Sequence, residues 1–223
     1  MSATPDLQRP LLLGHRGSRA VRSIPENTME SFERAMSDGA DGFEFDVRLT
    51  ANGQAVVCHD PHYQGVEIAT VCDEQLSGLA RFEQVLASFA DRAFLDIELK
   101  VGGLEKTTLK LLRENPPQRG FVVSSFLPEV LQRLRDTDAD VPLGLICETR
   151  DELGEWMRVP VQYVIPHHSR VDGRLVRELR GVGRKILVWT VNDPREMRRL
   201  RDLSVDGIIS DDPALLKRTT LWP

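Results

Sequence analysis

The sequence has few cysteines, no long apolar run and no excess of positive charge. Its 223 residues include three cysteines, Cys58, Cys72 and Cys147. An odd number without a Cys-x-x-Cys spacing argues against a disulfide scaffold. We expect three small buried residues in a protein of a reducing compartment.

No stretch approaches the ~20 consecutive apolar residues that a membrane-spanning helix needs. Near the N-terminus only three leucines, at 11–13, follow one another, without the charged and apolar regions of a signal peptide. We therefore expect a cytoplasmic protein with no stable membrane insertion.

The charge balance disfavours nucleic acid as a partner. The chain has 29 Lys+Arg against 34 Asp+Glu, a net charge of -5, and a pI near 5.6. A mildly acidic protein lacks the basic footprint of a nucleic-acid binder. The local arginine cluster at 195–201 has helical spacing, which is typical of a solvated helix face.

Short β-rich runs alternate with helical patterns along most of the chain. Eight strands are expected near positions 11, 43, 95, 121, 143, 163, 186 and 207. Helices are expected at 27–37, 150–157, 173–180 and 194–203, the last with Asp193 as its N-cap. Strands joined by helices of this length make a parallel sheet. Eight such units predict an α/β fold, a closed (β/α)₈ TIM barrel that occupies residues 1–223 as a single domain.

The second strand should continue into a β-hairpin extension. Asn-Gly at 52–53 is a strong two-residue turn signal, and 55–60 is the return strand. With that loop, His59 lies directly opposite Asp46 and shares its face. A slip of one residue would turn His59 away. No Gly-x-Gly-x-x-Gly follows the first strand, which disfavours an open nucleotide-binding sheet.

Three carboxylates, Glu44, Asp46 and Glu98, should converge from adjacent strands at the mouth of the barrel, where the active sites of this fold lie. Uncompensated, such close like charges raise one another's pKa and destabilise the fold. A hard divalent cation resolves this, and oxygen ligands suit Mg²⁺ or Ca²⁺. The alternative is a salt-bridge network with the basic residues nearby, which are Arg16, Arg48 and Lys100.

Two histidines, His15 and His59, flank this cluster. With unperturbed pKa values near 6.5, one can act as general acid and the other as general base. Arg16 and Lys100 add cations for an anionic substrate, and an arginine can bind phosphate through two parallel hydrogen bonds. Together these groups predict metal-dependent hydrolysis of a phosphodiester.

At these residues the sequence resembles the glycerophosphodiester phosphodiesterase family. The segments that carry the resemblance are HRG at 15–17, PENTMESF at 25–32, EFDV at 44–47, HDP at 59–61, ELK at 98–100, SSF at 124–126, WTVN at 189–192 and DGIISDDP at 206–213. Their order and spacing match the family from end to end.

The resemblance implies a (β/α)₈ barrel that releases sn-glycerol 3-phosphate and an alcohol from a small glycerophosphodiester, usually through a cyclic phosphate. It implies one divalent cation, Mg²⁺ or Ca²⁺. It assigns the metal to Glu44, Asp46 and Glu98, acid-base catalysis to His15 and His59, and the phosphate to Arg16 and Lys100.

Two further residues are candidates for substrate binding. Asn27 matches the Asn of PENT, which in the family looks like a residue that supports the site; the alternative, which can hold at the same time, is a helix N-cap. Trp189 could stack against the glycerol or the head group, and the alternative is a large core residue.

The segment after His59 departs from the family pattern. Residues 60–93 form a shortened cap, expected to be a loop with short helices near 73–79 and 82–89. A smaller cap would leave a more open mouth that admits a bulkier diester. The candidates to line the rim are His62, Tyr63, His167 and His168. The alternative for each is that it is simply a polar residue of a surface loop.

Two other functions stay open at this point. A lysophospholipase D-like or sphingomyelinase D-like enzyme resembles the same barrel, but such enzymes often carry signals or disulfides. A non-catalytic phosphate-binding barrel should have lost a histidine or a carboxylate, and all five are present. The released alcohol and the oligomeric state are left open by the sequence.

Overall fold

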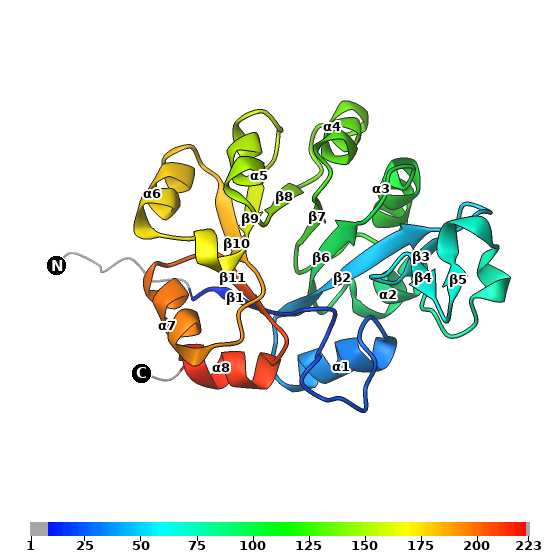
Figure 1. Cartoon of the computed structure of the whole chain (residues 1–223), viewed down its shortest axis with the longest axis horizontal. Coiled ribbons are helices and arrows are strands. Elements are labelled where there is room, and N and C mark those ends of the chain that lie inside the picture. Colours follow the sequence, from blue (N-terminus) through cyan, green and yellow to red (C-terminus); the bar gives the residue numbers. More distant parts are fainter. Residues whose placement is uncertain (1–8, 222–223) are drawn as a thin grey trace.

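A computed structural model describes residues 9–221, and within them eight parallel strands close into a barrel (Figure 1). The barrel strands are β1 (Leu11–Gly14), β2 (Gly42–Leu49), β6 (Phe94–Leu99), β7 (Phe121–Ser125), β8 (Leu143–Cys147), β9 (Tyr163–Pro166), β10 (Lys185–Val188) and β11 (Gly207–Ser210). Strand β1 pairs with β11 on one side and with β2 on the other, which closes the sheet. The predicted eight-stranded barrel is confirmed.

Helices surround the strands, as Figure 1 shows. They are α1 (Met29–Ser37), α2 (Phe82–Phe89), α3 (Glu105–Glu114), α4 (Pro128–Thr137), α5 (Arg150–Gly154), α6 (Gly173–Gly181), α7 (Pro194–Asp202) and α8 (Pro213–Leu221). The predicted start of α7 is confirmed, because the Asp193 carboxylate accepts from the backbone N–H groups of Arg195 and Glu196. Helix α1 is capped by Thr28 rather than by Asn27, so the N-cap alternative for Asn27 is wrong.

The period-2 pattern of β2 divides its side chains between the helix layer and the barrel interior. Phe43 and Phe45 are fully buried in the core beneath the helices. The Phe43 ring stacks on Phe32 of α1 at 4.3 Å and meets the edge of Phe89 of α2 at 4.9 Å. Each buried phenylalanine contributes about 1.5–3 kcal/mol. The intervening residues of β2 therefore face the interior of the barrel, where the site is built.

The β-hairpin extension is present, but its predicted register is wrong by one residue. Strand β3 (Ala55–Val57) pairs with β2 through a loop of three residues, 51–53, so that Cys58 rather than His59 bonds to the backbone of Asp46. The Thr50 hydroxyl accepts from the Gln54 N–H and holds the loop, and the Asn52 side chain bonds to Asp73, 21 residues on. A left-handed glycine, Gly53 at φ 80°, completes the three-residue turn.

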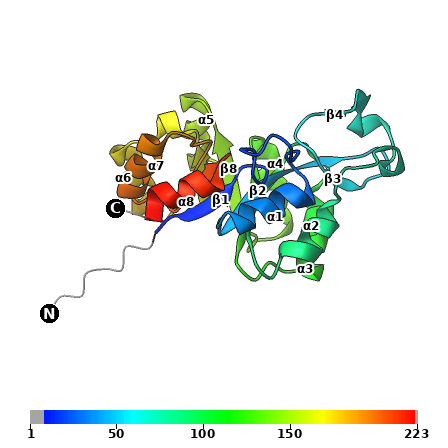
Figure 2. The same cartoon turned by 90° about the horizontal axis from the view of Figure 1, so that it is seen from below.

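The segment after the hairpin extends away from the barrel (Figure 2). It contains a small antiparallel pair, β4 (His62–Tyr63) and β5 (Val66–Glu67), followed by the 3₁₀ turns η1 (Ile68–Thr70) and η2 (Asp73–Gln75). Helix α2 differs from the rest of 60–93, because its buried face belongs to the main core. It therefore covers the barrel rather than its mouth.

Two further 3₁₀ turns, η3 (Glu155–Met157) and η4 (His168–Arg170), flank β9.

The three cysteines are free thiols in different environments. Cys147 is buried as predicted, whereas Cys58 is half-buried and Cys72 is exposed, so the prediction of three buried cysteines is wrong for those two. Within residues 9–221, no helix is both long enough and apolar enough to cross a bilayer.

Candidate active site

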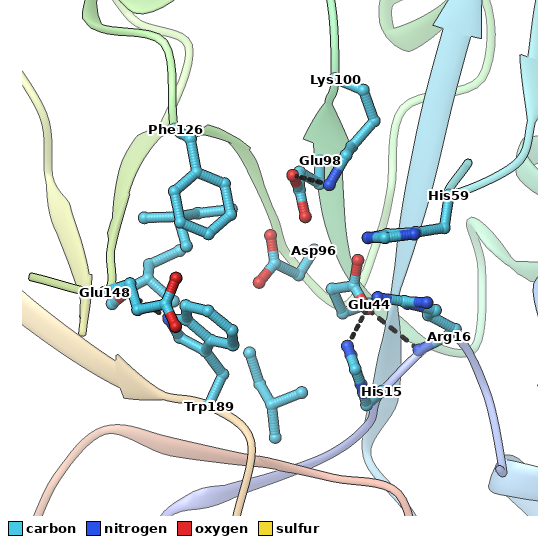
Figure 3. Close-up of a pocket in the computed structure, with 13 residues that line it drawn as sticks. His15, Arg16, Glu44, His59, Asp96, Glu98, Lys100, Phe126, Glu148 and Trp189 are labelled. Atoms are coloured by element: carbon cyan, nitrogen blue, oxygen red, sulfur yellow. Dashed lines mark hydrogen bonds and ion pairs between the residues drawn. The ribbon is translucent and has the colours of Figure 1, made fainter. Parts of the chain in front are cut away.

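A cavity of about 280 Å³ opens at the carboxyl ends of the strands (Figure 3). Its lining residues are His15, Arg16, Glu44, His59, Asp96, Glu98, Lys100, Phe126, Ile146, Glu148, Ile165, Trp189 and Ile209. Most of the predicted site residues are among them. Asp46 and Asn27 are buried beside the cavity rather than in its lining.

The structure brings Glu44, Asp46 and Glu98 together. Strands β2 and β6 pair in parallel with Asp46 beside Glu98, and each of the three carboxylates offers an oxygen within 4.8 Å of the others. All three side chains are buried. The predicted convergence follows directly from the register of the two strands.

Burial and mutual repulsion set the pKa values of this cluster. Burial, together with the neighbouring carboxylates, raises the pKa of Glu44 well above its usual range. Burial and the charge of Asp46 raise the pKa of Glu98 to about 7. Burial opposes ionisation of Asp46 as well, but Lys100 and Arg16 outweigh it and lower the pKa of that carboxyl.

The two cations contact this cluster from the cavity side. Lys100 Nζ lies 2.6 Å from Glu98 Oε1 and 3.4 Å from Asp46 Oδ1. Arg16 Nε lies 3.3 Å from Asp46 Oδ2. Part of the salt-bridge alternative is therefore real. Arg48 contributes a different contact, because its Nε donates to the His59 carbonyl at 2.8 Å.

A divalent cation nevertheless fits these residues. Glu44 Oε1 is buried and accepts no hydrogen bond from any described residue, and Asp46 Oδ1 has only the ion-pair contact with Lys100. An orphaned carboxylate oxygen in a buried site costs free energy that a metal ion would recover. The donors are all carboxylate oxygens, which suit Mg²⁺ or Ca²⁺.

His15 is held by a carboxylate that sequence reasoning did not assign to the site. Its Nδ1 lies 2.7 Å from Asp211 Oδ1, and its Nε2 lies 3.9 Å from Glu44 Oε2. Arg19 and Asn192 donate to the same Asp211 carboxylate at 2.9 and 2.7 Å. Burial lowers the pKa of His15 more than the Asp211 contact raises it.

His59 reaches the cavity from the other side although its predicted pairing is wrong. The chain leaves β3 after Val57, and the imidazole then turns toward the cavity. Its Nδ1 lies 2.7 Å from Asp60 Oδ1. The His59 side chain is 34% exposed against 13% for His15, so the two histidines occupy different environments.

The motifs HRG and PENT shape the floor of the site through unusual backbone. Arg16 and Asn27 adopt left-handed φ values of 51° and 58°. The Arg16 backbone N–H donates to Glu44 Oε2 at 3.0 Å, and the Asn27 amide donates to Asp46 Oδ2 at 2.8 Å. Gly17 has φ 82° and no room for a Cβ, which would lie 2.5 Å from Ser31 Oγ. Asn27 thus positions a carboxylate.

The opposite wall of the cavity is aromatic. Phe126 and Trp189 meet edge to face at 5.5 Å, and Trp189 Nε1 donates to the Ile165 carbonyl at 2.9 Å. Trp189 therefore lines the cavity and, half-buried, also packs against a cluster of buried core residues. The described lining residues include none of the four rim candidates, His62, Tyr63, His167 and His168.

Sequence reasoning assigned no role to several acidic groups of the site. Asp211 follows the last strand, a position that could have indicated it. Asp96 lies on the inward face of β6, accepts from Ser124 Oγ at 2.5 Å, and has its pKa raised by burial to about 7. Glu26, within PENT, accepts from Arg16 Nη1 at 2.6 Å. Glu148 follows β8 at the cavity wall.

The chain is similar to known proteins over nearly its whole length. Residues 15–94 and 90–215 match the sequence model of the glycerophosphoryl diester phosphodiesterase family. A glycerophosphodiester phosphodiesterase of Caldanaerobacter subterraneus subsp. tengcongensis is 28% identical, and the match covers 93% of this chain and 96% of that one.

Solved structures share the fold. A glycerophosphodiester phosphodiesterase from Thermotoga maritima is 25% identical with a TM-score of 0.79, covering 95% of this chain and 98% of that one. A phosphodiesterase from Oleispira antarctica, solved with its product sn-glycerol-3-phosphate, is 22% identical with a TM-score of 0.81, covering 95% and 96%. On the match of the family model, this chain belongs to the glycerophosphoryl diester phosphodiesterase family of enzymes.

Proposed function

We propose that this phosphodiesterase hydrolyses small glycerophosphodiesters to sn-glycerol 3-phosphate and an alcohol. The observation that carries the proposal is one cavity that joins a buried three-carboxylate cluster to two histidines and two cations. The product bound to the Oleispira antarctica relative supports the same choice of product.

Glu44, Asp46 and Glu98 would hold one divalent cation, either Mg²⁺ or Ca²⁺. When bound, it supplies Lewis-acid polarisation of a phosphoryl oxygen and neutralises the carboxylate charge. Arg16 and Lys100 are nearly covered, with 14% and 13% of each side chain exposed, and both lie at the cavity. They bind the remaining phosphate oxygens through charge-assisted hydrogen bonds.

The two histidines move the protons. In each ring Nδ1 faces a carboxylate, Asp211 for His15 and Asp60 for His59, which leaves Nε2 free to act on substrate. One histidine takes the proton of the neighbouring glycerol hydroxyl as that oxygen attacks phosphorus. The other protonates the departing alkoxide, and water then opens the cyclic phosphate.

The test is release of glycerol 3-phosphate from a panel of glycerophosphodiesters, with and without EDTA. We expect activity to require Mg²⁺ or Ca²⁺ and to fall by ~10³-fold or more in His15→Ala and His59→Ala, because each removes a proton-transfer group and its contacts. His62→Ala is the matched control, since His62 is exposed outside the described cavity lining. Metal-independent turnover, or full activity of His15→Ala, would refute the mechanism.

A lysophospholipid in the same panel separates the remaining enzyme alternative, a lysophospholipase D-like or sphingomyelinase D-like activity. The non-catalytic barrel loses its support, because the family is one of enzymes and all five polar residues converge. The single-domain organisation and the cytoplasmic location stay predictions of the sequence.

A further inference from the structure

The cavity has two chemically different sides. The catalytic groups occupy one side, and the other is built by Phe126, Ile146, Glu148, Ile165, Trp189 and Ile209. Figure 3 shows Phe126, Glu148 and Trp189 together, across the cavity from His15 and His59. Among these six described residues, only Glu148 is ionisable. A single carboxylate thus stands in a wall that is otherwise aliphatic and aromatic.

The backbone of Glu148 is fixed while its carboxylate is free. Its N–H donates to Glu152 Oε2 at 2.8 Å, and its carbonyl accepts from Arg170 Nε at 2.9 Å. Within residues 9–221, its carboxylate has no ion-pair partner and accepts no hydrogen bond. The negative charge therefore lies at the cavity with no cationic side chain of residues 9–221 in ion-pair contact, since Arg170 bonds to the Glu148 carbonyl instead.

The aromatic pair beside it is also fixed. Trp189 is anchored by its bond to the Ile165 carbonyl and by the edge of His167, whose ring centroid is 5.5 Å away. Phe126 stands perpendicular to Trp189, with 88° between the ring planes. Aromatic faces next to a carboxylate are the chemistry that recognises an alkylammonium ion. Lys100 Nζ is 5.7 Å from the Phe126 ring, but carboxylates hold it on the catalytic side.

We propose that Glu148, Phe126 and Trp189 form a subsite for a cationic head group, so that the enzyme prefers diesters of amino alcohols such as choline or ethanolamine. This inference rests on the proposed function. The charges of the cavity then match those of the substrate: Arg16 and Lys100 face the phosphate anion, and Glu148 faces the ammonium.

The test compares kcat/KM for three substrates, glycerophosphocholine, glycerophosphoethanolamine and the uncharged-head-group analogue glycerophosphoglycerol. In Glu148→Gln we expect values about five- to tenfold lower for the first two, at low salt, because one partly exposed charge contact is lost. Glycerophosphoglycerol should stay within about twofold of wild type, since glutamine still accepts hydrogen bonds from hydroxyl groups. Asp151→Asn is the control, because Asp151 is exposed in helix α5, three residues after Glu148, but outside the described cavity lining.

An equal loss on all three substrates would overturn the subsite and place Glu148 on the glycerol half. The subsite would also be overturned if Glu148→Gln left the kcat/KM values of all three substrates at their wild-type ratios. Wild-type protein that cleaves none of the three would instead refute the proposed function, and the subsite would fall with it. Active protein without the predicted preference refutes the subsite alone.

Discussion

The buried carboxylate of Glu98 should destabilise the protein at pH values above about 7 when its cation is removed. The rise of its pKa from 4.5 to about 7, caused by burial and by Asp46, corresponds to about 3 kcal/mol. Because the folded state holds the proton of Glu98 more tightly than the unfolded state, protonation adds this amount to the free energy of unfolding, and the contribution is complete below about pH 4.5. It is lost as the pH rises through 7.

Glu98→Gln removes the charge and keeps the shape. Glutamine still accepts a hydrogen bond from Lys100, so no buried donor loses its partner. In EDTA at pH 8, we expect the variant to be more stable than wild type by up to about 3 kcal/mol. This corresponds to a rise in Tm of about 6–10 °C for a chain of this size. Below about pH 4.5 the difference should vanish, and the affinity for Mg²⁺ or Ca²⁺ should fall by at least ~100-fold at neutral pH.

Thermal unfolding at pH 4.5 and 8, with EDTA and then with added cation, measures both effects, and calorimetry gives the affinity. Asp96→Asn is the matched control. Its buried carboxyl also has its pKa raised to about 7, but it lies outside the three-carboxylate cluster. It should gain stability in EDTA and keep its metal affinity. A Glu98→Gln protein that is less stable than wild type at pH 8 in EDTA, or that binds cations as wild type does, would refute the reasoning.

Two further changes test the groups that position the site. Asp211→Asn weakens the partner that orients His15 and should lower kcat/KM by about 10- to 100-fold. Calorimetry should show an unchanged cation affinity. Full activity of this variant would contradict the positioning role of Asp211. Asn27→Ala loses two buried hydrogen bonds with Asp46 and forces alanine to φ 58°, so it should cost about 2–4 kcal/mol in urea unfolding. An unchanged urea midpoint would show that neither contact stabilises the fold.

The barrel and most of the site were predictable because their determinants are local. In β2 the alternation alone separates Phe43 and Phe45, which pack under helices, from Glu44 and Asp46, which face inward. Parallel pairing of β2 with β6 then brings Glu98 to the same place. Both the alternation within β2 and the pairing of β2 with β6 follow from the order of residues and strands along the chain.

The errors arose where a distant side chain decides the local geometry. The turn at 51–53 has three residues instead of two, and in it the Asn52 side chain bonds to Asp73, a contact that the local Asn-Gly pattern does not show. The partnership of Asp211 with His15 joins residues 196 positions apart. It depends on closure of the barrel, which no pattern of a single segment specifies.

That closure also explains how the site is assembled. Strand β1 joins the first and last parts of the barrel, since it pairs with β2 on one side and β11 on the other. At its end, His15 contacts Glu44 of β2 and Asp211 just after β11. An open sheet in which β11 had not docked would leave His15 without Asp211. Barrel closure and the orientation of this histidine are therefore one structural event, and destabilisation of the β1–β11 seam should reduce activity before the protein unfolds.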